Sequence, residues 1–353
     1  MNRSTLSVAT FNLYNLNLPG LPLYTDIDGW SQDVYDRKVA FSAAQLRQLA
    51  PDVAALQELW HADAARSVLE ASGLAGTHTL LAPEDATGTH IVCAALVRTD
   101  LLAGEASWLA DFPTGFRLSS TGDDPQTPAI EVGIRGFSRP VLRFAIRPHA
   151  SASAVEVFVA HLKSKAPTRL DAERWYRDGR ATYAPHATGL GAALSTIRRT
   201  AEAAALRWLL TSVMKGTHTP VIVMGDLNDG HNSNTLNIIT GQPRFLVGDS
   251  LGGGDTALYT CQTLQEYRDS RDVYYTHVHQ DLRESLDHIL VSEQFYENSR
   301  RRLWVFDGLA INNDHLNVDD HRTSGTSDHG VVSARFRWAP APQPLLPAEV
   351  AAG

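Results

Sequence analysis

The feature that most constrains the fold is a series of short apolar segments, rich in β-branched residues, that alternate with amphipathic helical patterns. Short apolar runs of about 4–8 residues are typical of buried strands, and apolar residues at helical spacing are typical of helices that cover a sheet. The strand-like segments are residues 6–11, 53–56, 91–97, 155–160, 221–224, 286–291 and 331–336. This order predicts an α/β fold.

Two helical patterns stand out between these strands. Residues 34–49 carry apolar side chains at helical spacing and end before Pro51. The clearest helix is residues 194–213, and its spacing predicts one buried face. That face comprises Leu194, Ile197, Ala201, Ala205, Trp208 and Leu209.

The chain shows no internal linker, so residues 1–338 are predicted to form one catalytic domain, and the Ala/Pro-rich residues 339–353 a flexible tail. A hydrophobic content of 43% in 353 residues allows a full core without disulfides. Cys93 and Cys261 are too few for a disulfide framework, and Cys93, in an apolar run, is predicted to be buried. Neither a signal-peptide pattern nor an 18-residue apolar run is visible, so we expect a cytoplasmic enzyme without a membrane span or an obligate protein partner.

The charge is unevenly distributed. The formal net charge of −8 argues against a nucleic-acid partner, but residues 161–200 alone carry +5, which leaves −13 for the rest of the chain. Some of those acids belong to the site proposed below, where bound cations would offset them.

Polar residues cluster at or next to the ends of the predicted strands. Each motif by itself is more typical of a turn or a solvated strand end, because Asp and Asn bond readily to nearby backbone. Their joint, ordered occurrence is more informative. In chain order they are Asn12, Glu58, His161, Asp226, Asn228, Asp287, Asp328 and His329.

The motifs around these residues resemble those of the exonuclease–endonuclease–phosphatase superfamily, which includes pancreatic-type deoxyribonucleases, abasic-site endonucleases, neutral sphingomyelinases and inositol polyphosphate phosphatases. The resemblance runs from about residue 6 to residue 337. It implies a four-layered α/β/β/α sandwich of two mixed sheets flanked by helices, with the active site at one end between the sheets. The motifs are Phe-Asn at 11–12, Leu-Gln-Glu at 56–58, His-Leu at 161–162, Gly-Asp-Leu-Asn at 225–228, Leu-Asp-His-Ile-Leu at 286–290 and Ser-Asp-His at 327–329.

The residue types agree with metal-dependent hydrolysis of phosphate esters. Mg²⁺ prefers oxygen ligands, and Glu58 is the best single candidate, with Asn12 and Asp328 as further ligands. Mn²⁺ or Ca²⁺ would also fit this set. His329 is the candidate general base, because the pKa of imidazole lies near working pH.

The resemblance assigns roles to the remaining residues. It implies that Asp287 accepts a hydrogen bond from His329 and that Asp226 and Asn228 position the attacking water. It also implies that His161 contacts the phosphate or serves as an acid near the leaving group. A structural alternative for His161 is a strand-end histidine bonded to backbone.

Four other polar residues receive no catalytic role. His277 and His279 are interpreted as part of a solvated strand. Strand alternation predicts that His288 points away from the site, and Asp229 is interpreted as a turn residue.

In the superfamily that the chain resembles, insertions between the motifs set the substrate, and three such segments stand out here, residues 17–37, 112–139 and 163–191. The last mixes basic residues with Trp175, Tyr176 and Tyr183, which suits a polyanion but equally a solvated charged loop. The predicted substrate-binding residues are Lys163, Lys165, Arg174 and Arg177.

Three alternative functions are compatible with these sequence features. The first is an endonuclease-like phosphodiesterase on DNA or RNA. The second hydrolyses a small or lipid phosphate ester, although no amphipathic membrane-docking segment is evident in the sequence. The third is an inactive binding scaffold, which would require loss of a metal-binding or base residue, and all of these are present.

Overall fold

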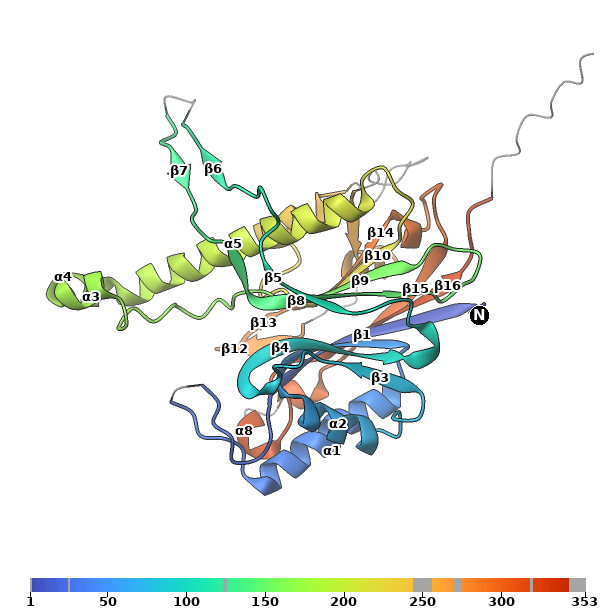
Figure 1. Cartoon of the computed structure of the whole chain (residues 1–353), viewed down its shortest axis with the longest axis horizontal. Helices are drawn as coiled ribbons and strands as arrows, with labels where there is room; N and C mark the ends of the chain where they lie inside the picture. Colours follow the sequence, from blue (N-terminus) through green and yellow to red (C-terminus); the bar gives the residue numbers. More distant parts are fainter. Residues whose placement is uncertain are drawn as a thin grey trace, which may run out of the picture.

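The computed structural model describes residues 2–24, 26–122, 126–243, 256–269, 275–317 and 320–342. These residues form the four layers that the resemblance implied, with two six-stranded sheets packed face to face and helices outside each (Figure 1). No helix in these ranges is long and apolar enough to cross a membrane. Most of the predicted flexible tail, residues 343–353, lies outside the described residues.

The first sheet has the strand order β15-β16-β1-β2-β4-β3. In it β1 runs parallel to β2 and antiparallel to β16, so the sheet is mixed. Helices α1 (Gln32–Leu49) and α2 (Ala62–Ala71) cover its outer face (Figure 1). The strands are β1 (Thr5–Leu16), β2 (Val53–His61), β3 (His78–Leu81), β4 (Thr87–Arg98), β15 (Trp304–Asn312) and β16 (Val331–Trp338).

The second sheet has the order β11-β14-β10-β9-β8-β5 and is also mixed, because β10 is parallel to β9 and antiparallel to β14. Helix α5 (Ala187–Met214) covers its outer face with α6 (Asn234–Thr240). The strands are β5 (Ser107–Asp111), β8 (Gly136–Ile146), β9 (Val155–His161), β10 (Val221–Asp226), β11 (Leu258–Thr260) and β14 (Asp287–Ser292).

Shorter elements lie outside these layers. Two small two-stranded pairings join β6 to β7 and β12 to β13. The bounds are β6 (Ser119–Ser120), β7 (Ile130–Glu131), β12 (His277–His279), β13 (Leu282–Glu284), α3 (Arg174–Asp178), α4 (Arg180–Tyr183), α7 (Cys261–Glu266) and α8 (His321–Ser324).

Strand alternation directs the polar residues toward the space between the sheets. On β10, Ile222 and Met224 pack in the core between the two sheets, whereas Val221 and Val223 pack in the core under α5. Because side chains alternate along a strand, Asp226 falls on the same face as Ile222 and Met224. Asn12 on β1, His161 on β9 and Asp287 on β14 follow the same rule. Cys93 is buried in this inter-sheet core, as predicted.

Gly225, the residue before Asp226, permits a close approach of two strands. It has φ of 147°, and a Cβ atom there would lie 1.8 Å from the backbone oxygen of Ala160 on β9. A glycine is therefore required at the end of β10, where the site begins.

The first part of α5 extends beyond the second sheet and, with α3 and α4, forms an arm comprising residues 174–200 (Figure 1). As a result, only part of the face of residues 194–213 that was predicted to be buried is buried in the structure. Ala201 and Ala205 are buried, but Leu194, Ile197 and Trp208 are 43–46% exposed. Leu194 and Ile197 are exposed because they lie on the arm, in the first half of α5, which extends beyond the second sheet. The buried face of α5 continues instead through Leu206, Leu210 and Met214.

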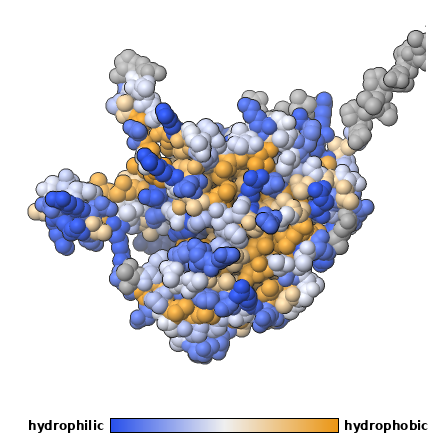
Figure 2. Space-filling view, viewed as in Figure 1, coloured by the Kyte–Doolittle hydropathy of each residue, from blue (hydrophilic) through white to orange (hydrophobic). Residues whose placement is uncertain are grey.

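An apolar groove of about 860 Å³ lies between the arm and the β6–β7 pair. We call it the arm groove. Hydrophobic surface appears at the base of the β6–β7 projection and along the arm, with hydrophilic residues gathered at the arm's outer end (Figure 2). The apolar side chains lining the groove include Leu118, Ile130, Val132, Ile134, Trp175, Leu194 and Ile197.

Candidate active site

Three predicted site residues are direct neighbours across three strands of the second sheet. Asp226 at the end of β10 pairs in register with His161 on β9 and with Asp287 on β14. All three side chains are buried. The sheet therefore presents two carboxyl groups and an imidazole side by side at the ends of three neighbouring strands.

Asp226 joins this group to the first sheet. Its Oδ2 accepts a hydrogen bond from Asn12 Nδ2 at 3.1 Å and lies 3.5 Å from His161 Nε2. Its Oδ1 accepts from the backbone N–H of Asn228 at 2.9 Å. The side-chain Nδ2 of Asn228 donates to the backbone oxygen of Leu162, which leaves its Oδ1 as the group able to hold a water.

His329, just before β16, is held by Asp287 as the resemblance implied. Nδ1 of the ring lies 2.8 Å from Asp287 Oδ2, and Nε2 lies 3.8 Å from Asp226 Oδ2. Burial lowers the pKa of the ring, but the carboxylates of Asp287 and Asp226 raise it by more, and the net pKa lies well above 6.5. The two carboxylates thus stabilise an imidazolium, the product of proton abstraction.

Asp226 shares this proton equilibrium. Burial raises the pKa of its carboxyl group to about 7, although His329 lowers it. A carboxyl group and an imidazole that both have raised pKa values lie 3.8 Å apart here, and shifted pKa values are typical of catalytic sites.

Glu58 and Asp328 form the part of the site that fits a cation. Glu58 accepts hydrogen bonds from Asn12 Nδ2 at 3.2 Å and from the backbone N–H of Asn15 at 3.0 Å. Burial and then the nearby Asp328 carboxylate raise the pKa of Glu58. Oδ1 of Asp328 is buried without a hydrogen-bond partner among the described residues. Two close carboxyl groups with an unpartnered oxygen are the donor set that a divalent cation stabilises.

Asn12 is a hydrogen-bond donor to the carboxyl groups of Glu58 and Asp226. Its Nδ2 donates to Glu58 and Asp226, and its Oδ1 accepts from the backbone N–H of Tyr14 at 3.0 Å. Asn12 therefore orients the two carboxyl groups, and its role as a metal ligand stays a prediction.

Two of the site residues have left-handed backbone conformations. Glu58 has φ of 57° and Asn228 has φ of 54°. Such values cost free energy outside glycine and are found preferentially at functional sites. At Glu58 the conformation breaks the alternation of β2.

His161 is buried, and its Nδ1 has no hydrogen-bond partner among the described residues. Burial, with Arg139 and His329 adding to it, lowers the pKa of its ring well below 6.5. The ring is therefore neutral near pH 7, which favours a hydrogen-bonding role at the phosphate over that of a charged acid.

A cavity of about 560 Å³ beside Glu58 collects basic and aromatic residues, and we call it the side cavity. Lys163, predicted from the sequence, lines it, together with Arg139, which the sequence analysis missed. The positive charge of Arg139 lowers the pKa of both Glu58 and His161, which places its guanidinium near them. Tyr24 and Trp60 form another wall, with ring centroids 5.0 Å apart.

The other three predicted substrate-binding residues lie elsewhere. Lys165 is paired with Glu284 at 2.7 Å and Asp229 at 3.4 Å. Arg174 and Arg177 lie in α3 at the outer end of the arm, away from the strand ends (Figure 1). The insertion folds into helices that project from the domain, so the structure does not bring these two arginines to the site.

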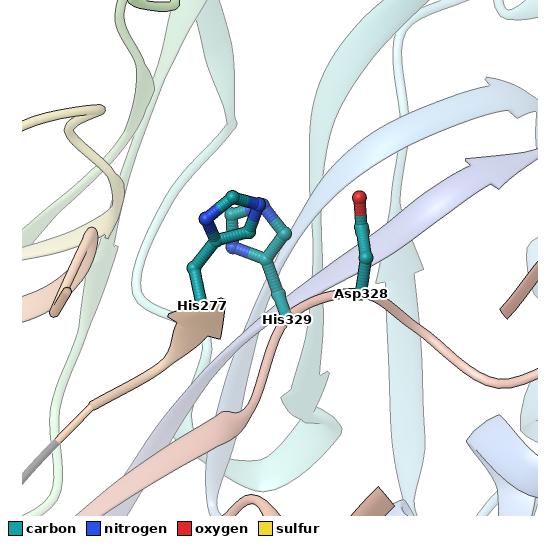
Figure 3. Close-up of side chains that lie close together, drawn as sticks. All are labelled: His277, Asp328 and His329. Carbon is teal, nitrogen blue, oxygen red and sulfur yellow. The ribbon is translucent and has the colours of Figure 1, made fainter. Parts of the chain in front are cut away.

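His277 belongs to the site, contrary to its interpretation as part of a solvated strand. It is half-buried, its backbone pairs with that of His329 in an isolated β-bridge, and the two ring centroids are 4.8 Å apart (Figure 3). No local pattern signals this contact, because it arises from pairing of segments distant in sequence.

The expectation for His288 is confirmed. His288 is buried on the opposite face of β14 from Asp287, with Nε2 2.9 Å from the backbone oxygen of Asp229. Asp229 accepts hydrogen bonds from the backbone N–H of Gly230 at 3.1 Å and from Thr235 Oγ1 at 2.7 Å, and its interpretation as a turn residue stays a prediction.

Comparisons with known proteins bear on the family and the fold. A sequence model of the endonuclease/exonuclease/phosphatase family matches residues 9–329. No curated protein sequence matches the chain.

Three solved structures are similar in fold. D. rerio TDP2 complexed with a single-strand DNA product is 15% identical with a TM-score of 0.53, and the match covers 95% of this chain and 100% of that one. Truncated Caenorhabditis elegans TDP2 is 12% identical with a TM-score of 0.54, covering 94% and 98%. An endonuclease/exonuclease/phosphatase from Bacteroides vulgatus is 14% identical with a TM-score of 0.54, covering 96% and 100%. At these identities the likeness shows the fold alone.

Proposed function

The chain belongs to the endonuclease/exonuclease/phosphatase family, and from this premise we propose that it is a divalent-metal-dependent phosphodiesterase that acts on nucleic acid in the manner of an endonuclease. The side cavity carries the proposal. It gathers two cations, Arg139 and Lys163, and two aromatic rings, Tyr24 and Trp60, and Arg139 lies near enough to Glu58 to lower the pKa of its carboxyl group. Cations that contact phosphates and rings that stack on bases are the usual combination at single-stranded nucleic-acid sites.

Binding comes first in the mechanism. Arg139 and Lys163 hold the phosphate backbone, and His161 contributes a neutral imidazole that forms a hydrogen bond without adding charge. A base next to the bound phosphate then has the exposed Tyr24 ring on which to stack.

Proton transfer follows at the buried end of the site. Asp226 and the free Oδ1 of Asn228 position a water, and Nε2 of His329 takes its proton. Asp287 holds Nδ1 of the same ring and stabilises the imidazolium that forms.

Glu58 and Asp328 would hold the cation, with Asn12 beside them. A cation held there would supply positive charge to offset the charge that develops on the phosphate oxygens and on the leaving oxygen. Oxygen donors suit Mg²⁺, Mn²⁺ or Ca²⁺, and we propose Mg²⁺.

Substrate profiling tests the proposal. Purified protein is incubated with plasmid DNA, single-stranded DNA, RNA or bis-p-nitrophenyl phosphate, each with Mg²⁺, Mn²⁺, Ca²⁺ or EDTA. The similarity to a TDP2 structure that holds single-strand DNA makes that substrate the first choice. EDTA-sensitive cleavage of a nucleic acid is expected. Hydrolysis of the small diester alone would reject the nuclease, and no hydrolysis with any metal would favour an inactive scaffold.

The arm groove favours a second candidate, hydrolysis of a lipid phosphate ester. The sequence showed no docking segment, but the structure exposes Leu194, Ile197 and Trp175 beside basic residues of the arm. Exposed apolar side chains next to cations suit an anionic lipid surface.

Vesicle experiments separate the two candidates. Release of phosphorylated headgroups from anionic phospholipid vesicles would be measured for the wild-type protein and for a Leu194→Ser, Ile197→Ser double variant. Leu282→Ser is the control, because Leu282 is 68% exposed but does not line the groove. Loss of lipid hydrolysis only in the double variant would support the lipid ester, and absence of lipid hydrolysis in the wild type would reject it.

A further inference from the structure

His277, which the proposed mechanism does not use, lies together with Asp328 and His329, which it does use. Each offers one potential ligand atom, and these three atoms lie within 4.8 Å of one another. The two imidazole rings lie side by side with the Asp328 carboxyl group next to them (Figure 3). His277 is half-buried.

The backbone fixes this cluster. His277 and His329 pair in a β-bridge, and the N–H of Gly330 donates to the backbone oxygen of Thr276 at 2.7 Å. Both histidines are thereby attached to a short stretch of paired backbone, independently of their side chains. The cluster is therefore built into the fold.

His329 and Asp328 each have one potential ligand atom available on the side chain. Nδ1 of His329 is bonded to Asp287, so Nε2 is the nitrogen that remains for a metal. A histidine that ligates a metal commonly donates its other ring N–H to a carboxylate in this way. Oδ1 of Asp328 is buried and has no hydrogen-bond partner among the described residues.

Two imidazoles and one carboxylate differ in chemistry from the oxygen donors around Glu58. Imidazole nitrogen suits Zn²⁺ and similar transition metals, whereas Mg²⁺ prefers oxygen. We propose that His277, Asp328 and His329 form a Zn²⁺ site whose occupation inhibits the enzyme. The inhibitory part rests on the proposed function, because Zn²⁺ would occupy the lone pair with which His329 accepts the proton.

The site also shares Asp328 with the proposed Mg²⁺ site. Zn²⁺ bound to His277 and His329 would therefore compete for a carboxylate that the hydrolytic cation needs. Zinc–nitrogen bonds are about 2.0–2.1 Å, so binding requires the three side chains to rotate toward a common centre. A fourth position would be taken by water, as in other zinc sites with three protein ligands.

Metal binding is measured first, without any substrate. Zn²⁺ affinity is determined by competition with a chromogenic chelator for the full chain and for His277→Phe, His277→Gln and His279→Phe. His279 is the matched control, because it lies two residues along the same strand and outside the cluster. Mutation of a residue that only hydrogen-bonds to a metal ligand typically lowers metal affinity by about 10–100-fold. Loss of His277, a direct ligand, is therefore expected to weaken Zn²⁺ binding by at least about 10-fold.

Inhibition is measured second, as the Zn²⁺ concentration that halves Mg²⁺-supported hydrolysis of the best substrate. We expect this concentration to rise at least about 10-fold in both His277 variants and to stay unchanged in His279→Phe. Circular dichroism checks that each variant folds. If His277→Phe does not fold, His277→Gln provides the same test.

The outcomes separate the two proposals. Equal Zn²⁺ affinity of wild type and both His277 variants would overturn the zinc site, as would binding of Zn²⁺ no tighter than Mg²⁺. Selective binding through His277 in a protein that hydrolyses no phosphate ester would support the site and reject the proposed function. Zn²⁺ binding through His277 without inhibition of an active enzyme would overturn the inhibitory role.

Discussion

Nδ1 of His329 lies 2.8 Å from Oδ2 of Asp287, and both side chains are almost completely buried. The contact joins β14 of the second sheet to the segment just before β16 of the first sheet, so the packing of the two sheets against each other creates it. It fixes the ring orientation and leaves Nε2 directed toward Asp226. The proposed base is therefore positioned by the fold.

Replacement of Asp287 by asparagine tests this contact through the pH profile. Asp287 raises the pKa of His329, so its loss should lower that pKa. The base is active when unprotonated, and the acid limb of the pH–rate profile should therefore move to lower pH. We expect kcat to fall by about 10²–10⁴-fold, because the amide no longer stabilises the imidazolium. An acid limb at the wild-type pH would assign that limb to another group.

Glu58→Gln tests the cation site. The neutral amide keeps the size of the side chain but removes the charge that would bind Mg²⁺. We expect the Mg²⁺ concentration for half-maximal activity to rise by at least about tenfold, and excess Mg²⁺ to restore part of the rate. Titration of Mg²⁺ at fixed substrate measures this. An unchanged titration curve would remove Glu58 from the ligand set.

Two arginines provide a matched test of substrate binding. Arg139 lines the side cavity, whereas Arg174 is on the arm with a side chain 90% exposed. Each phosphate contact contributes about one unit to the dependence of log affinity on log salt. Arg139→Met should therefore weaken single-stranded DNA binding and reduce that slope by about 1, while Arg174→Met should leave both unchanged. Fluorescence anisotropy between low and moderate salt measures the slope. Equal effects of the two variants would show that the arm binds the substrate.

Local sequence patterns predicted an α/β fold and the strands at whose ends the candidate residues lie, whereas the four layers and several residue roles came from the resemblance to the family. Asp226 is on the inner face of β10 because alternation continues from Ile222 and Met224, and a reader of the sequence can follow the same alternation. The exposed Leu194 and Ile197 have the same helical spacing as buried residues, and only their position on the arm distinguishes the two cases. The contact between His277 and His329 depends on long-range pairing, which no local pattern contains.

Gly225→Ala tests whether the close approach of β9 and β10 is required. The new Cβ would lie 1.8 Å from the backbone oxygen of Ala160, and the φ of 147° is unfavourable for alanine. We expect the free energy of unfolding to fall by about 2–5 kcal/mol, measured by urea denaturation. Gly230→Ala is the control, because a Cβ there has no atom within 4 Å. Comparable stability of the two variants would mean that the strands can separate at little cost.

Lys38 on α1 offers a test of electrostatics near the site. Its side chain is 1% exposed, and its ammonium lies 4.8 Å from the centre of the Tyr14 ring and 4.7 Å from that of Trp30. Burial lowers its pKa from 10.5 to about 7, although Asp328 and Glu58 oppose the shift. Below pH 7 the folded and unfolded states both carry the charge, so the full cost of burying it reduces stability. As pH rises from 7 toward 10.5, the folded state loses the proton first and that cost declines.

The wild-type protein should therefore gain stability relative to Lys38→Met by about 2 kcal/mol between pH 7 and pH 9. Methionine keeps most of the packing volume without a charge, so the difference between the two proteins isolates the titration of Lys38. Urea denaturation at pH 6, 7, 8 and 9 in EDTA measures it, with Lys215→Met as a control because Lys215 is exposed at the end of α5. Parallel stability curves for the wild type and Lys38→Met would show that the ammonium keeps its ordinary pKa. In that case Asp328, Glu58 and the two rings would fully compensate for burial of the charge.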